Sequence, residues 1–216
     1  MKRRDASAGN RTPKSRPTSG RHTRTLAQAT RPPSGARLDA MSWSARAVES
    51  TVVAVDGSYI LEGPPRPEDA AAHRMFALDP DSARFFGWTV EQALSQPDSH
   101  YDEVIKRFAQ EWGEGRTFTF TIRDRKRGTP VGSVEIRLSD ANISYVVAPE
   151  LRGQGLATRA VEALLRWCVD ALALDHVNLT CHAENIASRR VAEKCRFVLV
   201  SQEGDELRFQ RDFSPA

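Results

Sequence analysis

The sequence has few of the residues and runs that mark secreted, membrane-spanning or metal-binding proteins. It has only three cysteines, Cys168, Cys181 and Cys195, an odd number without Cys-x-x-Cys spacing. We therefore expect reduced packing residues and no disulfide or metal site. No apolar run approaches the ~18 residues that span a bilayer, and no apolar segment follows the basic Lys2–Arg4 to make a secretory signal. These absences favour a cytoplasmic protein without membrane contact, and the chain also has no internal repeat.

Charge is unevenly distributed along the 216 residues. Residues 1–40 hold ten Lys or Arg against Asp5 and Asp39, a net charge of +8. Because the whole chain is +3, residues 41–216 carry −5. The high isoelectric point therefore belongs to the N-terminal segment, and the rest of the chain is mildly acidic.

The basic N-terminal segment has the composition of a disordered tail. It is rich in Ser, Thr, Pro and Gly and has almost no large apolar residues, so it cannot bury enough surface to offset its ordering entropy. We expect a tail over residues 1–50 and one folded domain over residues 51–216. Such a tail can make a weak contact with nucleic acid. A solvated extension, or translation that begins at Met41, is favoured because no aromatic residues are interleaved for stacking on bases.

Residues 51–216 alternate between strand and helix periodicity. Strands are expected at residues 59–61, 117–122, 131–138, 143–148, 177–181, 197–201 and 207–213. Helices are expected from residues 64–69 onward and at residues 98–112, 158–173 and 185–194. The order predicts an α+β fold in which about four helices flank a mixed sheet of about seven strands.

The most informative segment joins the strand at residues 143–148 to the helix at residues 158–173. It reads Arg-Gly-Gln-Gly-Leu-Ala over residues 152–157. Free backbone N–H groups at a helix N-terminus, together with the helix dipole, make an anion site. Gly153 and Gly155 leave room for a phosphate to approach the backbone. The turn predicts a phosphate site, although the same glycines also suit a plain tight turn.

A second run, over residues 185–197, completes a family pattern. The two runs resemble the GNAT N-acetyltransferases, and within them the RimJ/RimL-like branch of ribosomal-protein-alanine acetyltransferases. The first motif, Arg/Gln-x-x-Gly-x-Gly/Ala, is matched by Arg152, Gly155 and Ala157. The second, Asn-x-x-Ser followed by Val-x-Glu-Lys and Phe, is matched by Asn185, Ser188, Val191, Glu193, Lys194 and Phe197. The resemblance is close over residues 142–197, looser over residues 61–138 and absent before about residue 51.

The resemblance implies a GNAT fold, with a twisted and mostly antiparallel sheet, and acetyl-CoA as co-substrate. It places the pyrophosphate on Arg152, Gly153, Gln154, Gly155, Leu156 and Ala157, with the Thr158 hydroxyl nearby. The pantetheine arm is expected along Tyr145–Val147, where a backbone N–H of Val146 or Val147 meets the thioester carbonyl. Asn185 is expected to bond the pantetheine amide, to cap its own helix, or to do both.

Two residues are candidates for the chemistry of acetyl transfer. Many relatives carry a tyrosine where this chain has Ala192. The resemblance to the RimL-like branch instead implies that Ser188 orients or protonates the sulfur of CoA, unless its hydroxyl only bonds its own helix. Asn142 stands where many RimL-like proteins carry a Glu. Glu135 is then the nearest candidate base, acting through water; the alternative that it is an exposed strand carboxylate is favoured.

The expected function is transfer of acetyl from acetyl-CoA to a primary amine. The acceptor is either the α-amine of a protein N-terminus or a small-molecule amine, and a non-catalytic CoA-binding module is the alternative. The oligomeric state is not indicated. Arg196 replaces the glycine that usually precedes Phe197, which costs about 1 kcal/mol if the left-handed geometry of that position persists.

Overall fold

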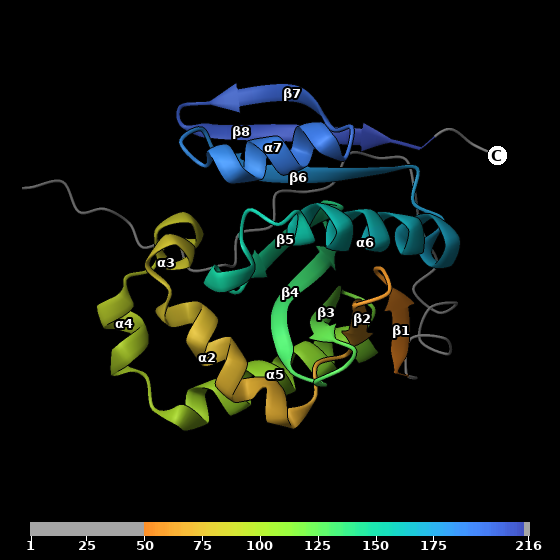
Figure 1. The fold of residues 1–216 in the computed structure, drawn as a ribbon. Coiled ribbons are helices and arrows are strands. Elements are labelled where there is room, and N and C mark those ends of the chain that lie inside the picture. The colour runs from red at the N-terminus through yellow and green to blue at the C-terminus, as the bar shows by residue number, and fades with distance from the viewer. Residues whose placement is uncertain (1–49, 214–216) are drawn as a thin grey trace, which may run out of the picture. The chain divides into compact units, whose positions relative to one another are not determined.

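The computed structural model describes residues 50–213, so the predicted tail over residues 1–50 lies outside the described residues except for its last residue. The strands are β1 (Thr51–Ala54), β2 (Tyr59–Gly63), β3 (Thr117–Asp124), β4 (Pro130–Arg137), β5 (Asn142–Val147), β6 (His176–His182), β7 (Val198–Glu203) and β8 (Glu206–Asp212). They form one sheet in the order β1-β2-β3-β4-β5-β6-β8-β7 (Figure 1). Neighbouring strands pair antiparallel except β5 and β6, which are parallel. The α+β fold with a mixed sheet is confirmed.

The helices form two groups around this sheet. They are α2 (Ala70–Leu78), α3 (Pro80–Phe86), α4 (Val90–Ser95), α5 (Asp98–Gly113), α6 (Leu156–Leu172) and α7 (Ile186–Lys194), with 3-10 turns η1 (Pro67–Asp69) and η2 (Pro149–Leu151). Helix α2 packs against α3, α4 and α5, whereas α6 packs across β1, β2, β4 and β5 and α7 contacts β6 (Figure 1). None of the helices within residues 50–213 is long and apolar enough to cross a membrane.

The core lies between α6 and the apolar face of the sheet. Phe118, Phe120 and Ile122 alternate along β3 with threonines and are almost completely buried, as period-2 patterning predicts. On α6, a stripe at helical spacing meets them: Val161, Leu164, Leu165, Cys168 and Leu172. The sequence therefore predicted both partners of the main packing interface.

Three elements were missed by the sequence prediction. Among residues 50–213, strand β1 raises the number of strands from about seven to eight, and α3 and α4 raise the number of helices. Both helices are shorter than two full turns, so apolar periodicity cannot develop in them. Their starts are nevertheless capped, since Asp79 accepts from the Ser82 N–H and Thr89 from the Gln92 N–H. Side-chain caps of this kind were the available signal.

A buried ion cluster joins the opposite face of the sheet to the start of α2. Arg123 on β3 is 5% exposed and donates to Glu62 at 2.6 Å and to Asp69 at 2.9 Å. Asp69, which is fully buried, also accepts from the Thr121 hydroxyl at 2.8 Å. Glu62 also pairs with Arg66, so two arginines face the two carboxylates, and Arg123 is the one that meets both.

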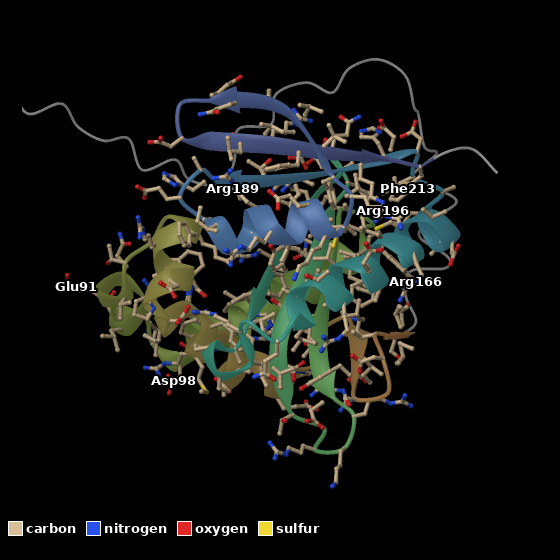
Figure 2. All side chains as sticks on the ribbon, turned by 45° about the horizontal axis from the view of Figure 1, so that its top comes forward. Glu91, Asp98, Arg166, Arg189, Arg196 and Phe213 are labelled. Carbon is tan, nitrogen blue, oxygen red and sulfur yellow. The ribbon has the colours of Figure 1, made fainter. Side chains whose placement is uncertain are left out.

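The end of α7 has a left-handed backbone geometry that favours glycine, although this sequence has Arg196 there. Arg196 has a φ of 59°, and its N–H donates to the Glu193 carbonyl while that of Phe197 donates to Ala192. This is a Schellman motif, in which glycine is preferred at the left-handed residue. The expected left-handed geometry therefore persists with an arginine in place (Figure 2 labels Arg196).

Arg196→Gly is expected to stabilise the protein by about 1 kcal/mol because glycine removes the steric cost of the left-handed backbone. The measurement is the midpoint of urea unfolding. Arg196→Ala is the matched control, since it removes the charge but keeps Cβ, and it should gain nothing. Equal stabilisation by both variants would place the cost in the side chain instead of the backbone.

Candidate functional site

The sheet opens between β5 and β6. The two parallel strands pair only at Asn142–Asn178 and Ile143–Leu179, whereas β5 stays paired with β4 along its full length, as far as Val147. The second half of β5 therefore has a neighbour on one side only. Its outer edge forms part of a cavity of about 520 Å³.

The cavity is built from three regions that lie far apart in the sequence: α3, the end of β5 with the loop into α6, and α7. Its walls include Tyr145, Val146 and Val147 of β5, Arg152, Gly153, Gly155, Leu156, Ala157 and Thr158 around the start of α6, Asn185, Ser188, Arg190 and Lys194 of α7, and Arg84, Phe85 and Phe86 of α3. The structure thus gathers nearly all of the predicted cofactor-binding residues around one space. Gln154 and Glu135 are the two predicted site residues that do not line it.

Backbone alternation along β5 distinguishes the two predicted carbonyl-binding donors. Ala148 donates its N–H to Val131 on β4 at 2.9 Å. In an antiparallel ladder, successive residues point alternately toward and away from the paired strand. Val146 therefore turns toward β4 as Ala148 does, and Val147 faces the open side. The Val147 carbonyl also points away from β4, since it accepts a hydrogen bond from Arg152 Nε at 3.2 Å. This geometry favours Val147 over Val146 as a donor to the cavity.

The loop before α6 presents an uncapped helix N-terminus. Gly153 and Gly155 both have a φ of 74°, and no atom lies within 4 Å of where a Cβ on Gly153 would be. The N–H groups of the first turn of a helix have no intrahelical partner, and no side chain caps α6, a helix of 17 residues. The first residues of α6 line the cavity. An anionic group such as a pyrophosphate fits this end of it.

The side chain of Arg152 is held by acidic residues at the start of α3. It pairs with Asp79, whose side chain is 9% exposed, and with Asp81 at 3.1 Å. Burial by itself raises the pKa of Asp79, but hydrogen bonds from Arg152 and Ser82 outweigh it and hold that pKa below its usual value. Arg152 therefore contributes to the loop by fixing its position against α3.

Asp79→Asn is expected to lower the free energy of unfolding by about 1–3 kcal/mol, because Arg152 loses its buried countercharge while asparagine still caps α3. A looser loop should also weaken CoA binding severalfold. Urea unfolding and calorimetric titration measure the two effects.

The control is Asp81→Asn, which removes an exposed carboxylate from the same arginine and should cost under about 0.5 kcal/mol. If the two variants behaved alike, Asp79 would have no special part in holding the loop.

The start of α7 carries the second predicted motif. The Asn185 side chain accepts from the Ser188 N–H at 3.0 Å, so Asn185 caps the helix with its amide oxygen, and its amide NH₂ takes no part in this bond. The Ser188 Oγ lies 3.0 Å from the Tyr145 hydroxyl across the cavity. Ser188 thus makes a contact with β5, beyond any bond within its own helix.

The basic residues of α7 divide between the cavity and its surroundings. Arg190 and Lys194, one helical turn apart, line the cavity. Arg189, which Figure 2 labels, instead donates to the Ala183 carbonyl at 3.4 Å. The positive charge at this wall comes from Arg190 and Lys194, and Lys194 was not among the predicted binding residues. Its place four residues after Arg190 was the available signal.

Glu135 lies on β4, outside the cavity. Its carboxylate accepts from Ser144 at 2.8 Å and from Thr119 at 3.1 Å, so it is a bonded, partly buried strand residue. Its part as a base stays a prediction. The carboxylates that do line the cavity are Asp81 and Glu184, and Glu184 is paired with Arg84. Within residues 50–213, no group of three or more His, Cys, Asp or Glu could hold a metal ion.

Comparison with known proteins agrees with the fold. The model of the acetyltransferase (GNAT) domain family matches residues 60–198. A RimL ribosomal L7/L12 α-N-protein acetyltransferase in complex with coenzyme A has 15% sequence identity and a TM-score of 0.64 over 75% of this chain and 98% of its own. The ribosomal-protein-S5-alanine acetyltransferase from Vibrio fischeri has the same identity and TM-score over 75% of this chain and 96% of its own. These likenesses show a shared fold.

One curated relative has a different kind of name. The serine–tRNA ligase of Leptothrix cholodnii is 30% identical over 96 residues, which are 43% of this chain and 21% of the ligase. The match therefore spans about a fifth of that relative's length. It extends over too little of the ligase to carry its activity to this chain.

Proposed function

The chain belongs to the family of GNAT acetyltransferase domains, and we propose that it transfers acetyl from acetyl-CoA to a primary amine, with the α-amine of a protein N-terminus as the acceptor. Family membership confirms the resemblance that the sequence motifs indicated and makes the chain an acyltransferase with acetyl-CoA as co-substrate. The acceptor and the roles of the individual residues are parts of the proposal.

The observation that carries the proposal is that three kinds of group line one cavity. The uncapped start of α6 suits the pyrophosphate of CoA. The open edge of β5 offers the Val147 N–H to a carbonyl, and Ser188 lines the same cavity from α7. These groups match the parts of one extended thioester: an anion, an acyl carbonyl and a sulfur. Preorganised donors at such a carbonyl are typically worth about 3 kcal/mol.

An α-amine suits the chemistry of this cavity better than a lysine amine. Acetyl transfer needs the neutral amine, and an α-amine has a pKa near about 8 against about 10.4 for lysine. Of the carboxylates in the wall, Glu184 is paired with Arg84 and Asp81 with Arg152. Because the described part of the wall offers no unpaired carboxylate to take the proton, the acceptor that needs least help is favoured. The named activities of the RimL and S5-alanine relatives support the same class.

Thiol release from acetyl-CoA with three kinds of acceptor tests the proposal. The first is a peptide with a free N-terminal alanine. The second is the N-acetylated form of that peptide with an internal lysine, whose side chain is then the amine that it offers. The third is a small polyamine such as spermidine. We expect release with the first peptide and little with the others. Preference for spermidine would overturn the acceptor class. Binding of acetyl-CoA without release with any amine would favour the non-catalytic module.

The tail and the location complete the proposal. We place the domain boundary near residue 50, assign to the basic segment at most a weak contact with nucleic acid, and place the protein in the cytoplasm.

Deleting residues 1–40 is expected to leave the melting temperature and the basal thiol release unchanged, because the segment lacks core-forming residues. Scanning calorimetry and the release assay measure this. A marked loss of stability in the truncated chain would contradict the boundary.

A further inference from the structure

A hydrogen bond between two hydroxyl groups links β5 to α7 in the wall of the cavity. The Tyr145 phenol and the Ser188 Oγ lie 3.0 Å apart, although 43 residues separate them in the sequence. Both side chains line the cavity. Tyr145 was expected to contribute its backbone, and the structure shows that its side chain reaches the residue expected at the sulfur.

The chemistry of the two hydroxyls fixes the direction of this hydrogen bond. A phenol is a stronger acid than an aliphatic alcohol, so Tyr145 is the natural donor and Ser188 the acceptor. Burial also raises the pKa of Tyr145 above its usual value, so the phenol keeps its proton at working pH. A serine hydroxyl has one proton. When its oxygen accepts from Tyr145, that proton points to another partner.

The backbone of Ser188 is also fixed by a hydrogen bond. Its backbone N–H donates to the Asn185 side chain at 3.0 Å, which fixes the first turn of α7. Ala192, where relatives carry a hydroxyl, is fully buried in the core and offers no donor. The hydroxyl that accompanies Ser188 in the cavity therefore comes from Tyr145 on β5 and not from position 192 on α7.

We propose that Tyr145 is a positioning residue that aims the Ser188 O–H at the sulfur of the departing CoA. This inference rests on the proposed function. In the transfer, the amine nitrogen bonds to the acyl carbon and the carbon–sulfur bond breaks, leaving its electron pair on sulfur. The surplus proton on nitrogen passes to solvent. Ser188 stabilises the sulfur by a hydrogen bond, which is worth most when the sulfur is charged, and Tyr145 remains protonated throughout.

The pKa of the thiol of bound CoA tests this without any acceptor. Thiolate absorbance is followed as a function of pH for CoA on the wild type, Tyr145→Phe and Ser188→Ala, with the CoA-free protein subtracted. The protein's own thiols interfere little, because burial raises the pKa of Cys168 and Cys195 to about 12 and that of Cys181 above its usual value. We expect the pKa of bound CoA to lie below that of free CoA in the wild type and to rise in both variants.

Kinetics give the second reading. Tyr145→Phe should lower kcat for the alanine peptide about tenfold, with KM for acetyl-CoA and the Kd of CoA unchanged, because the contact strengthens only as charge develops. The double variant should match Ser188→Ala alone, since Tyr145 acts through Ser188.

The outcomes separate this inference from the proposed function. A Tyr145→Phe protein with the wild-type thiol pKa and kcat would overturn the inference, as would a loss of CoA affinity as large as its loss of kcat. A wild type that releases no thiol with any amine would overturn the proposed function. In that case the titration of bound CoA would still decide whether Tyr145 and Ser188 act on the sulfur.

Discussion

Ala157→Asp is expected to lower the affinity for CoA at least about 100-fold while leaving the protein folded. Ala157 lies in the first turn of α6 and lines the cavity, so a carboxylate there would face the pyrophosphate. Two like charges about 4 Å apart repel by roughly 4 kcal/mol near a protein surface. The same carboxylate interacts favourably with the helix dipole, by about 0.3–1 kcal/mol. Binding and stability are therefore expected to move in opposite directions.

Isothermal titration with CoA and urea unfolding measure the two quantities. Arg166→Gln is the control, because Arg166 is exposed on the same helix (Figure 2) and the substitution changes the charge by the same amount. Gly155 would be a poorer target, since its φ is 74° and a Cβ at that position would lie 3.2 Å from Arg159 Nη1, which would add strain. Tight CoA binding by a folded Ala157→Asp protein would show that the loop is only a turn.

Arg123→Leu is expected to have the largest effect on stability, a loss of about 3–5 kcal/mol. The substitution leaves Glu62 and Asp69 buried without their shared cation, and an unpaired buried charge costs far more than the intact pair contributes. Glu62 would keep its pairing with Arg66. Asp69 would keep only the Thr121 hydroxyl and the Arg66 backbone N–H among these donors, and neutral donors do not replace its ion pair. The cluster joins β2 and β3 to the start of α2, so its loss should loosen that corner of the domain.

Chemical unfolding measures this change. Arg137→Leu is the control, since Arg137 pairs with Asp140 where both side chains are over 40% exposed. An exposed pair contributes at most about 1 kcal/mol. Similar losses in the two variants would mean that burial of the Arg123 cluster has no energetic consequence.

The sequence predicted the parts of the site that depend on local geometry. The glycines of the loop and the capping Asn185 act through neighbouring residues, and their spacing reports the strand–turn–helix and helix-start conformations directly. The positive φ at Arg196 was likewise expected from the resemblance, because relatives usually carry glycine there and a glycine that ends a helix often has a positive φ. In each case the structural consequence lies within a few residues of its cause.

The parts that depend on distant contacts were not predictable from one sequence. Asp79 meets Arg152 across 73 residues, and the phenol of Tyr145 meets Ser188 across 43. The opening between β5 and β6 depends on where their pairing stops, which neither strand's periodicity records. Short helices such as α3, which supplies Asp81 and Phe85 to the cavity, lack a periodic signal. Glu135 shows the reverse case, a chemically suitable residue on a face that the cavity does not reach.

Thermal unfolding with and without acetyl-CoA tests the central claim most directly, that this cavity holds the acetyl donor. At a hundredfold excess over Kd, binding to the folded state alone adds about 2.7 kcal/mol, which raises the melting temperature by roughly 5–10 °C for a domain of this size. Ala157→Asp should show no such rise, and Arg166→Gln should show all of it. A wild-type melting temperature unchanged by millimolar acetyl-CoA would contradict the account.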